Sequence, residues 1–374
     1  MDVRQIFSFL LLFSGLAIAD PTDASDVVVP DSPPIGKIAS VTPLFEHGNG
    51  YNIYRIPAIT CAPNGDLIVV CDGRVDYNDL NGSRKIDIVM RRSSDGGNTW
   101  TPCETAFSEG EGKPVSDPSL VTDRITGELF CFYNFMDQDL SEQEYRLHVR
   151  KSQDNGKSWD NAIDITGAIT PETWNRDFKF ITSGQAWQTR DGKILHTLVN
   201  LNDNRKGVFL FGSHDHGKSW KRYETLITPA DESKFVELSN GEWMVNSRVN
   251  GNGCRYVHRS RDGGKTWEST PDAVLVDPSC NAVILPYRYQ NETKDLDLLF
   301  FCNNNDPVDR KNLTLRLSTD QGKTWTRQQV LDPGDCGYVD MTALPDGTLG
   351  IVYETANGCN FLRFIPEWAD QKNN

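Results

Sequence analysis

The sequence predicts an all-β fold, a six-bladed β-propeller, on three observations. A short repeat, Ser-x-Asp-x-Gly-x-(Thr/Ser)-Trp, occurs five times at unequal but blade-sized intervals. A strand-like run precedes each copy, and a glycine-containing hairpin lies upstream of it. A sixth hairpin near the end of the chain has no repeat after it, so the count gives six units of about four strands each. The repeats lie at residues 93–100, 152–159, 213–220, 260–267 and 318–325.

Each unit begins with the hairpin. The first spans residues 56–70 around Asn64-Gly65-Asp66, and the fourth spans residues 235–249 around Asn240-Gly241. Further hairpins begin near Asp117, Gln185, Cys280 and Tyr338. The strand-like runs that follow are residues 86–92, 145–151, 208–212, 254–259, 313–317 and, without a repeat, 360–364. A β-sandwich would explain neither the count nor the fixed position of the repeat.

The repeat itself has turn chemistry, and we interpret it as structural. Its Asp can accept hydrogen bonds from turn amides, its Gly can adopt a positive φ, and its Trp can pack under the turn. The five copies are therefore expected to join the third and fourth strands of their units.

The N-terminal residues predict export. Residues 1–19 contain Arg4, an apolar run over 6–18 and Ala17-Ile18-Ala19 before Asp20, which is typical of a cleavable secretory signal. A signal anchor is the alternative. Residues 20–40 are expected to be a flexible lead-in and 41–374 a single propeller domain. We expect a secreted or exported protein, whether extracellular, periplasmic or lysosomal.

The composition of the chain limits the classes of binding partner and cofactor that we expect. A net charge of −14 argues against nucleic acid and anionic membranes, and the apolar run is short for a membrane span, so a soluble protein without membrane insertion is expected. Nine cysteines in an exported chain suggest some disulfides, with at least one thiol left over. The six histidines form no metal motif, and no cofactor is implied. Glycosylation sequons begin at Asn81, Asn291 and Asn312.

Propeller topology predicts where a site would lie. The starts of first and third strands, together with the loops between second and third strands, meet at one end of the axis, opposite the repeats. Three guanidiniums among carboxylates at that end imply an anionic ligand, a carboxylate or phosphate, gripped by forked hydrogen bonds. The residues at these positions are Arg55, Asp79, Asp117, Glu237, Arg255, Arg310 and Tyr338.

These segments resemble the exo-α-sialidase family, and most of all its lysosomal-type branch. The resemblance covers roughly residues 40–366, including the five repeats, which resemble the family's Asp boxes. The matching segments are Tyr54-Arg55-Ile56-Pro57, residues 236–248 with Glu237, Cys254-Arg255, residues 310–316 and Gly337-Tyr338. Residues 183–187 depart from the Gly-Pro-Gly stretch usual in the family, and this leaves any role for Trp174 or Trp187 open.

The resemblance implies a catalytic set. Tyr338 would attack the anomeric carbon, Glu237 would take the tyrosine proton, and Asp79 would be the acid/base, with Asp76 as the alternative. A neutral phenol suits a substrate whose anomeric carbon carries a carboxylate, because an anionic nucleophile would be repelled.

The resemblance also implies how substrate is held. Arg55, Arg255 and Arg310 would bind the carboxylate, and Arg74 would touch the substrate. Asp117 and Arg248 would either contact ligand or act structurally, Asp117 by capping a turn and Arg248 by orienting Glu237.

The implied function is an exo-α-sialidase that removes terminal α-linked sialic acids from glycoproteins, glycolipids or oligosaccharides with retention of configuration. Sialylated glycans are the expected partners. A trans-sialidase and an intramolecular trans-sialidase keep the same residues but change the product. A non-catalytic sialic-acid lectin is the alternative from another class, and it would need only the arginines. The sequence does not address the oligomeric state.

Overall fold

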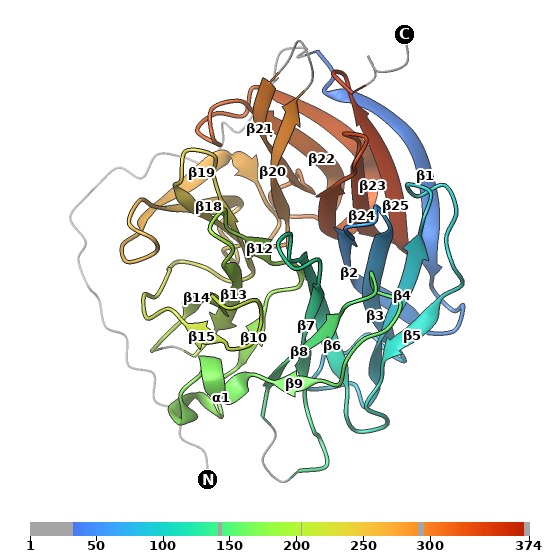
Figure 1. Cartoon of the computed structure of the whole chain (residues 1–374), viewed down its shortest axis with the longest axis vertical. Helices are drawn as coiled ribbons and strands as arrows, with labels where there is room; N and C mark the ends of the chain where they lie inside the picture. Colours follow the sequence, from blue (N-terminus) through green and yellow to red (C-terminus); the bar gives the residue numbers. More distant parts are fainter. Residues whose placement is uncertain (1–32, 141–143, 203, 291–294, 370–374) are drawn as a thin grey trace, which may run out of the picture. The chain divides into compact units, whose positions relative to one another are not determined.

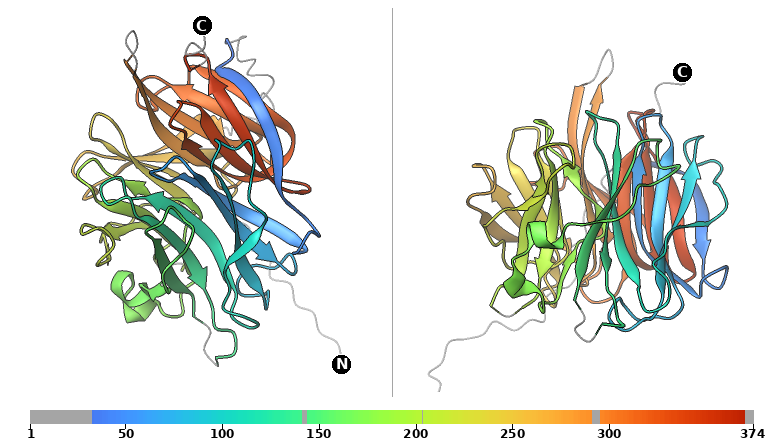
Figure 2. Two further views of the ribbon diagram at one scale, coloured as in Figure 1. Left: turned by 45° about the vertical axis from the view of Figure 1, so that its right-hand side comes forward. Right: turned by 60° about the horizontal axis from the view of Figure 1, so that its bottom comes forward.

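The computed structural model describes residues 33–140, 144–202, 204–290 and 295–369. Regular structure in these ranges is almost entirely β-strand, with one turn of α-helix and one of 3-10 helix. Within the unit formed by residues 33–374, the sheets stand around a common axis (Figure 1). Figure 2 shows the same sheets from two other sides. The predicted all-β propeller is confirmed.

The first three units follow one another along the chain, and a short parallel pairing between β11 and β6 links the second to the third. The first unit contains β2 (Ile53–Cys61), β3 (Leu67–Arg74), β4 (Ile86–Ser93) and β5 (Glu104–Phe107). The second contains β6 (Val115–Thr122), β7 (Leu129–Phe135), β8 (Arg146–Ser152) and β9 (Ile163–Asp164). The third, after α1 (Thr166–Ile169) and η1 (Glu172–Trp174), contains β10 (Lys179–Ile181), β11 (Gly184–Gln185), β12 (Trp187–Gln188), β13 (Ile194–Asn200), β14 (Gly207–Ser213) and β15 (Lys221–Arg222).

In the last three units, one long strand, β23 (Arg327–Ala343), belongs to two neighbouring sheets. The first half of β23 is the outer strand of the fifth unit, paired with β22, and its second half is the inner strand of the sixth, paired with β24. The fourth unit contains β16 (Ser233–Glu237), β17 (Trp243–Ser247), β18 (Cys254–Ser260) and β19 (Glu268–Val276). The fifth and sixth contain β20 (Val283–Gln290), β21 (Asp295–Asn304), β22 (Lys311–Ser318), β23 (Arg327–Ala343), β24 (Leu349–Thr355) and β25 (Gly358–Pro366).

An N-terminal strand completes the sixth unit. Strand β1 (Gly36–Glu46) pairs antiparallel with β25, from Gly36 opposite Pro366 to Glu46 opposite Gly358. The strand that was missing from the last unit in the sequence pattern is therefore supplied from the other end of the domain. Because β1 begins at Gly36, residues 36–40 belong to the sheet and not to the lead-in that was expected to extend to residue 40.

The five repeats form turns held by the same hydrogen bonds. In the first, the Ser93 hydroxyl donates to Asp95 at 2.8 Å, and Thr99 donates to Asp95 from its amide at 2.9 Å and its hydroxyl at 2.6 Å. The bonds from Thr99 lower the pKa of Asp95 to about 2. The Trp100 ring packs on Phe361 of the sixth unit with ring centroids 5.0 Å apart. A Cβ on Gly97 would lie 2.2 Å from that same ring, at a backbone φ of +91°, so glycine is required there.

The hydrophobic core lies between neighbouring sheets. One cluster, for example, joins Val70 and Met90 of the first unit to Leu120 and Tyr133 of the second. Since apolar side chains fill these inter-sheet layers, the strand ends nearest the axis are left to polar residues.

The structure also bears on the expected disulfides and on membrane-spanning helices. All nine cysteines lie in the described ranges as free thiols, so the expected disulfides are not formed in this structure. No helix in the described ranges is long and apolar enough to cross a membrane. The predicted signal at residues 1–19 and the sequon at Asn291 lie outside the described residues.

Candidate active site

A cavity of about 420 Å³ opens at one end of the axis. Its walls come from the starts of inner strands and from the loop between β3 and β4, as the topology predicted. The polar residues that line it include Arg55, Asp79, Asn81, Asp117, Asp231, Glu232, Arg248, Asn250, Arg310 and Tyr338.

A tyrosine–glutamate–arginine cluster lies at the bottom of this cavity. The Tyr338 hydroxyl donates a hydrogen bond of 2.6 Å to Oε1 of Glu232, and Arg248 donates one of 2.6 Å to Oε2. Arg248 also lies 3.4 Å from the Tyr338 hydroxyl. Burial and the charge of Glu232 raise the pKa of Tyr338 well above its usual value, against the lowering effect of Arg248 and Arg55. The phenol is therefore neutral and already hydrogen-bonded to a base.

Two more guanidiniums flank the tyrosine ring. The Cζ atoms of Arg55 and Arg310 lie 5.4 and 5.5 Å from its centroid. Glu354 positions both Arg55 and the Tyr338 backbone. Its carboxylate pairs with Arg55 at 3.2 Å and accepts hydrogen bonds from the backbone N–H groups of Ile56 at 2.7 Å and Tyr338 at 3.1 Å. Arg310 donates to the Ser279 carbonyl at 3.1 Å. The three arginines thus converge on one small volume.

Glu237 is not the partner of Tyr338, and that expectation is wrong. Glu237 is the last residue of β16, whereas Glu232 directly precedes its first residue. A rise of about 3.3 Å per residue puts the two positions roughly 17 Å apart along the strand. Glu237 instead accepts the Arg190 backbone N–H at 2.6 Å. The hairpin at Asn240-Gly241 was predicted correctly, but the strand before it begins two residues earlier than expected.

Arg255 likewise does not line the cavity, where the expected carboxylate contact would place it. It is fully buried in β18 and donates to the Cys280 carbonyl at 2.7 Å, to Asn246 at 2.8 Å and to Asp277 at 3.2 Å. These bonds hold the fourth unit to the segment that leads into β20. Arg248, which follows β17, occupies the cavity in its place.

Asp79, the predicted acid, lies in the cavity wall as expected, whereas Arg74 lies behind the wall. Asp79 lines the cavity on the loop after β3, with 72% of its side chain exposed. Arg74 is fully buried and does not line the cavity, where the expected substrate contact would place it; it donates to Asp79 at 2.7 Å and to Asp72 at 2.8 Å. Asp76, the alternative acid, accepts the Asn78 amide and is not part of the cavity wall. Arg74 therefore holds the loop that carries Asp79.

Asp117 lines the cavity beside this loop. Its backbone, at a φ of +60°, donates to Asp72 at 3.0 Å, and its carboxylate accepts from Asn134 at 3.1 Å. Burial and the charge of Asp72 raise the pKa of Asp117 to about 8, so at mildly acidic pH it is a neutral acid that can donate a hydrogen bond. Of the two expected roles, its position in the wall favours contact with ligand.

Three aromatic side chains that sequence reasoning missed form part of the cavity wall. Tyr145 packs on Phe178, with centroids 5.0 Å apart, and Phe178 packs on Phe180 at 5.5 Å. All three line the cavity. Trp174 does not, because it is buried between Phe209 and Arg222. Among the described residues, no group of His, Cys, Asp and Glu is arranged to hold a metal ion.

Glu232 and Glu354 were also missed, for different reasons. Glu232 stands beside Asp231 just before a strand-like run, and this acidic pair at a strand start is the signal that could have found it. Glu354 contacts Ile56 across 298 residues of sequence, and no local pattern announces such a contact.

The class of this protein follows from a match to a protein family. The family description "BNR repeat-like domain" matches residues 77–351, so the chain is a BNR-repeat propeller. It is 33% identical over 394 residues to a "Sialidase" of Micromonospora viridifaciens, covering 98% of this chain and 60% of that relative. The structure of "Hadza microbial sialidase Hz136" matches with a TM-score of 0.78 and 28% identity, covering 85% of this chain and 67% of the other. A leech intramolecular trans-sialidase shares the fold, with a TM-score of 0.72, 18% identity, and coverage of 85% and 67%. The chain belongs to the BNR repeat-like family, and it spans about 60% of the length of the sialidase that it matches at 33% identity.

Proposed function

We propose that the protein is an exo-α-sialidase that hydrolyses terminal α-linked sialic acids with retention of configuration, using Tyr338 as the nucleophile. The observation that carries the proposal is the 2.6 Å hydrogen bond from Tyr338 to Glu232 inside a ring of three arginines. A carboxylate-binding protein would need the arginines, but it would not need a base on a buried phenol.

The arginines provide the binding step. Arg55, Arg248 and Arg310 converge on a volume large enough for a carboxylate, to which their guanidiniums can donate charge-assisted hydrogen bonds. Arg55 and Arg248 are held by Glu354 and Glu232, so less side-chain freedom is lost when substrate binds. A sialic acid anchored in this way presents its anomeric carbon, which carries the carboxylate, to the Tyr338 hydroxyl.

The first chemical step forms a glycosyl-tyrosine. As the Tyr338 oxygen bonds to the anomeric carbon, its proton passes to Glu232 and the bond to the aglycone oxygen breaks. Asp79 gives its proton to that leaving oxygen. The raised pKa of Tyr338 keeps the phenol neutral before attack, so it is not repelled by the substrate carboxylate.

The second step returns the enzyme to its starting state. Asp79, now ionised and exposed to solvent, takes a proton from water, and the hydroxide oxygen bonds to the anomeric carbon as the bond to Tyr338 breaks. The phenolate recovers its proton from Glu232. Two displacements at one carbon retain the α-configuration.

Product analysis tests the proposal. The protein is incubated with α2,3-sialyllactose near pH 5, and the products are followed by proton NMR. The proposal expects α-configured free sialic acid before the β-anomer accumulates. Early β-anomer would contradict retention, an anhydro sugar would identify an intramolecular trans-sialidase, and transfer to an added acceptor sugar would identify a trans-sialidase. Ligand line-broadening without any product would identify a lectin.

A Tyr338→Phe variant tests the nucleophile. The change removes one oxygen from a side chain whose ring is held between two guanidiniums, so the cavity keeps its shape. We expect turnover to fall by several orders of magnitude while substrate still binds. Unchanged turnover would show that another group attacks.

The setting of the activity is proposed with it. We infer that the substrates are sialylated glycans met outside the cytoplasm, and the signal-like residues 1–19 support this. Recovery of the mature chain, beginning near Asp20, from the exported fraction of the producing cell would test it.

A further inference from the structure

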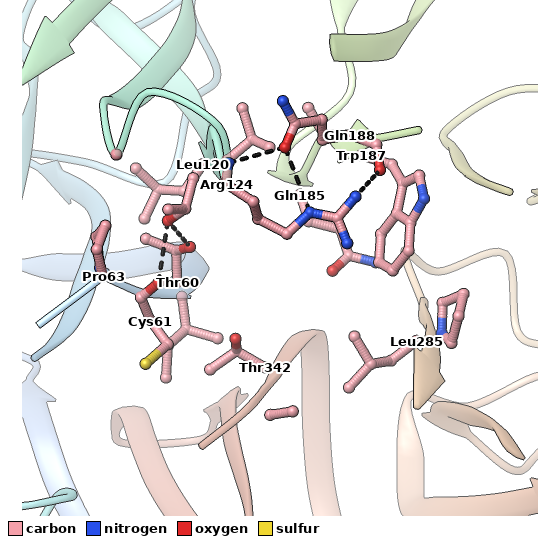
Figure 3. A pocket seen from close by; sticks show the side chains of 17 residues that line it. Thr60, Cys61, Pro63, Leu120, Arg124, Gln185, Trp187, Gln188, Leu285 and Thr342 are labelled. Atoms are coloured by element: carbon pink, nitrogen blue, oxygen red, sulfur yellow. Dashed lines mark hydrogen bonds between the residues drawn. The ribbon is translucent and has the colours of Figure 1, made fainter. Parts of the chain in front are cut away.

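A second cavity, of about 470 Å³, is lined by residues of inner strands from several units, and Figure 3 shows their side chains. We call it the rear pocket. Strands that contribute to the active site also reach it: β2 carries Arg55 at one end and Thr60 at the other, and β23 carries Tyr338 and, four residues later, Thr342. A rise of about 3.3 Å per residue separates the last two by roughly 13 Å. The two pockets therefore share strands without sharing residues.

The axis between the pockets is filled. Lys234 and Asp340 lie there at 1% and 0% exposure, each two residues beyond a member of the Glu232–Tyr338 pair. Asp340 accepts the Ile59 amide at 2.9 Å, and Lys234 donates to the Ser183 carbonyl. Gly184 approaches both side chains, since a Cβ there would lie 2.8 Å from Lys234 Nζ. A molecule in the rear pocket cannot reach the nucleophile, so this pocket is not part of the reaction path.

The wall of the rear pocket is neutral and mixed. It contains no Asp or Glu, and its only charged residue, Arg124, is exposed and donates to the Gln188 carbonyl at 2.7 Å and to its side chain at 3.3 Å. Trp187 is half-buried, and its ring forms one side of the cavity (Figure 3). The other labelled residues are Thr60, Cys61, Pro63, Leu120, Gln185, Leu285 and Thr342.

We propose that the rear pocket binds one neutral pyranose ring, stacked on Trp187 and hydrogen-bonded by side chains such as Thr60 and Thr342. A pyranose has an apolar C–H face, which suits the negative face of an indole, and a rim of hydroxyls that both donate and accept. The Thr342 hydroxyl can do both, and the Thr60 hydroxyl, which is bonded to Thr122 at 3.0 Å, can still accept. The volume is within the range of small-ligand sites.

Other ligand classes fit the wall less well. An anion would meet a single guanidinium that is already committed to Gln188 at the mouth. A metal ion would find no carboxylate in the wall. An alkyl chain would leave the Thr342 hydroxyl facing hydrocarbon. The proposal does not depend on turnover at the other end of the axis.

The test uses methyl β-galactopyranoside and methyl β-glucopyranoside as neutral probes and benzoate as an anionic probe, all with the full-length protein. Binding is measured by titration with ligand-observed NMR. A Thr342→Phe variant fills the pocket, and Thr270→Phe on the exposed outer strand β19 is the matched control. We expect saturable binding of at least one pyranoside, weakened at least about tenfold by T342F and unchanged by T270F.

Sialoside turnover by the same variants separates a local effect from misfolding, because Thr342 does not line the active site. If T342F fails to fold, Trp187→Leu replaces it. Pyranoside binding that survives both changes would overturn the proposal, as would binding of benzoate alone or of no probe. Failure of this test would leave the proposed sialidase activity untouched, and failure of that activity would leave sugar binding here unaffected.

Discussion

The contrast between Glu232 and Glu237 is the sharpest prediction. In Glu232→Gln, the side chain keeps its size but loses its charge, and both oxygens are engaged in the native protein, by Tyr338 at 2.6 Å and by Arg248 at 2.6 Å. A positioned general base contributes about 10²–10⁴ in rate, or about 3–5 kcal/mol of barrier. We expect kcat to fall by that factor and KM to change by only a few fold, because the arginines remain.

Glu237→Gln is the matched control. It removes the same charge at the other end of β16, where the carboxylate bonds Arg190. The glutamine oxygen can still accept the Arg190 N–H, so loss of the charge weakens that hydrogen bond by about 1 kcal/mol or less and leaves kcat within about twofold. Steady-state kinetics on an aryl α-sialoside and on sialyllactose, with denaturant unfolding of each variant, measure both effects. Equal kcat losses in the two variants, or a fully active E232Q, would refute the assignment of the base.

Three further predictions follow from the site. Arg248→Met should lower kcat/KM by about 10² or more through lost charge-assisted bonds, whereas Arg255→Met should mainly lower the unfolding free energy; kinetics beside denaturant melts distinguish them. Burial raises the pKa of Asp340 to about 7, so the stability that its protonated form contributes is full below about pH 4 and is lost as pH rises through 7. The unfolding free energy of Asp340→Asn, measured from pH 4 to 8, should therefore fall less with pH than that of the native protein. Gly337→Ala would place a Cβ 2.0 Å from Glu354, so it should lower both stability and turnover, and a native melting temperature would contradict this.

A feature of the fold could be predicted when the residues that form it lie close together in the sequence. The repeat turns are built within eight residues, so Ser93, Asp95 and Trp100 announce them locally. Arg55 and Tyr338 stand in short segments at strand starts, and the structure brings them together. The β1–β25 pairing joins residues more than 300 positions apart and left no trace in the local pattern.

Two of the misplaced residues, Glu237 and Arg255, show where such reasoning fails. Choosing between Glu232 and Glu237 requires knowing where β16 begins, and strand starts are poorly specified by composition. Arg248 and Arg255 lie at the same end of one hairpin, and only packing between units decides which guanidinium faces the axis. The first error concerns a strand boundary and the second the direction of a side chain, and tertiary contacts settle both.

The pairing of β1 with β25 has a consequence for the order in which this molecule becomes active. Arg55 comes from the first unit and Tyr338 from the sixth, on either side of the seam that this pairing closes. During synthesis the N-terminal strand must wait for almost the whole domain before its partner exists, and such a distant contact forms slowly. The nucleophile and the first arginine therefore meet only after closure. A partly made or opened ring holds the catalytic residues apart, and activity itself reports that the ring is complete.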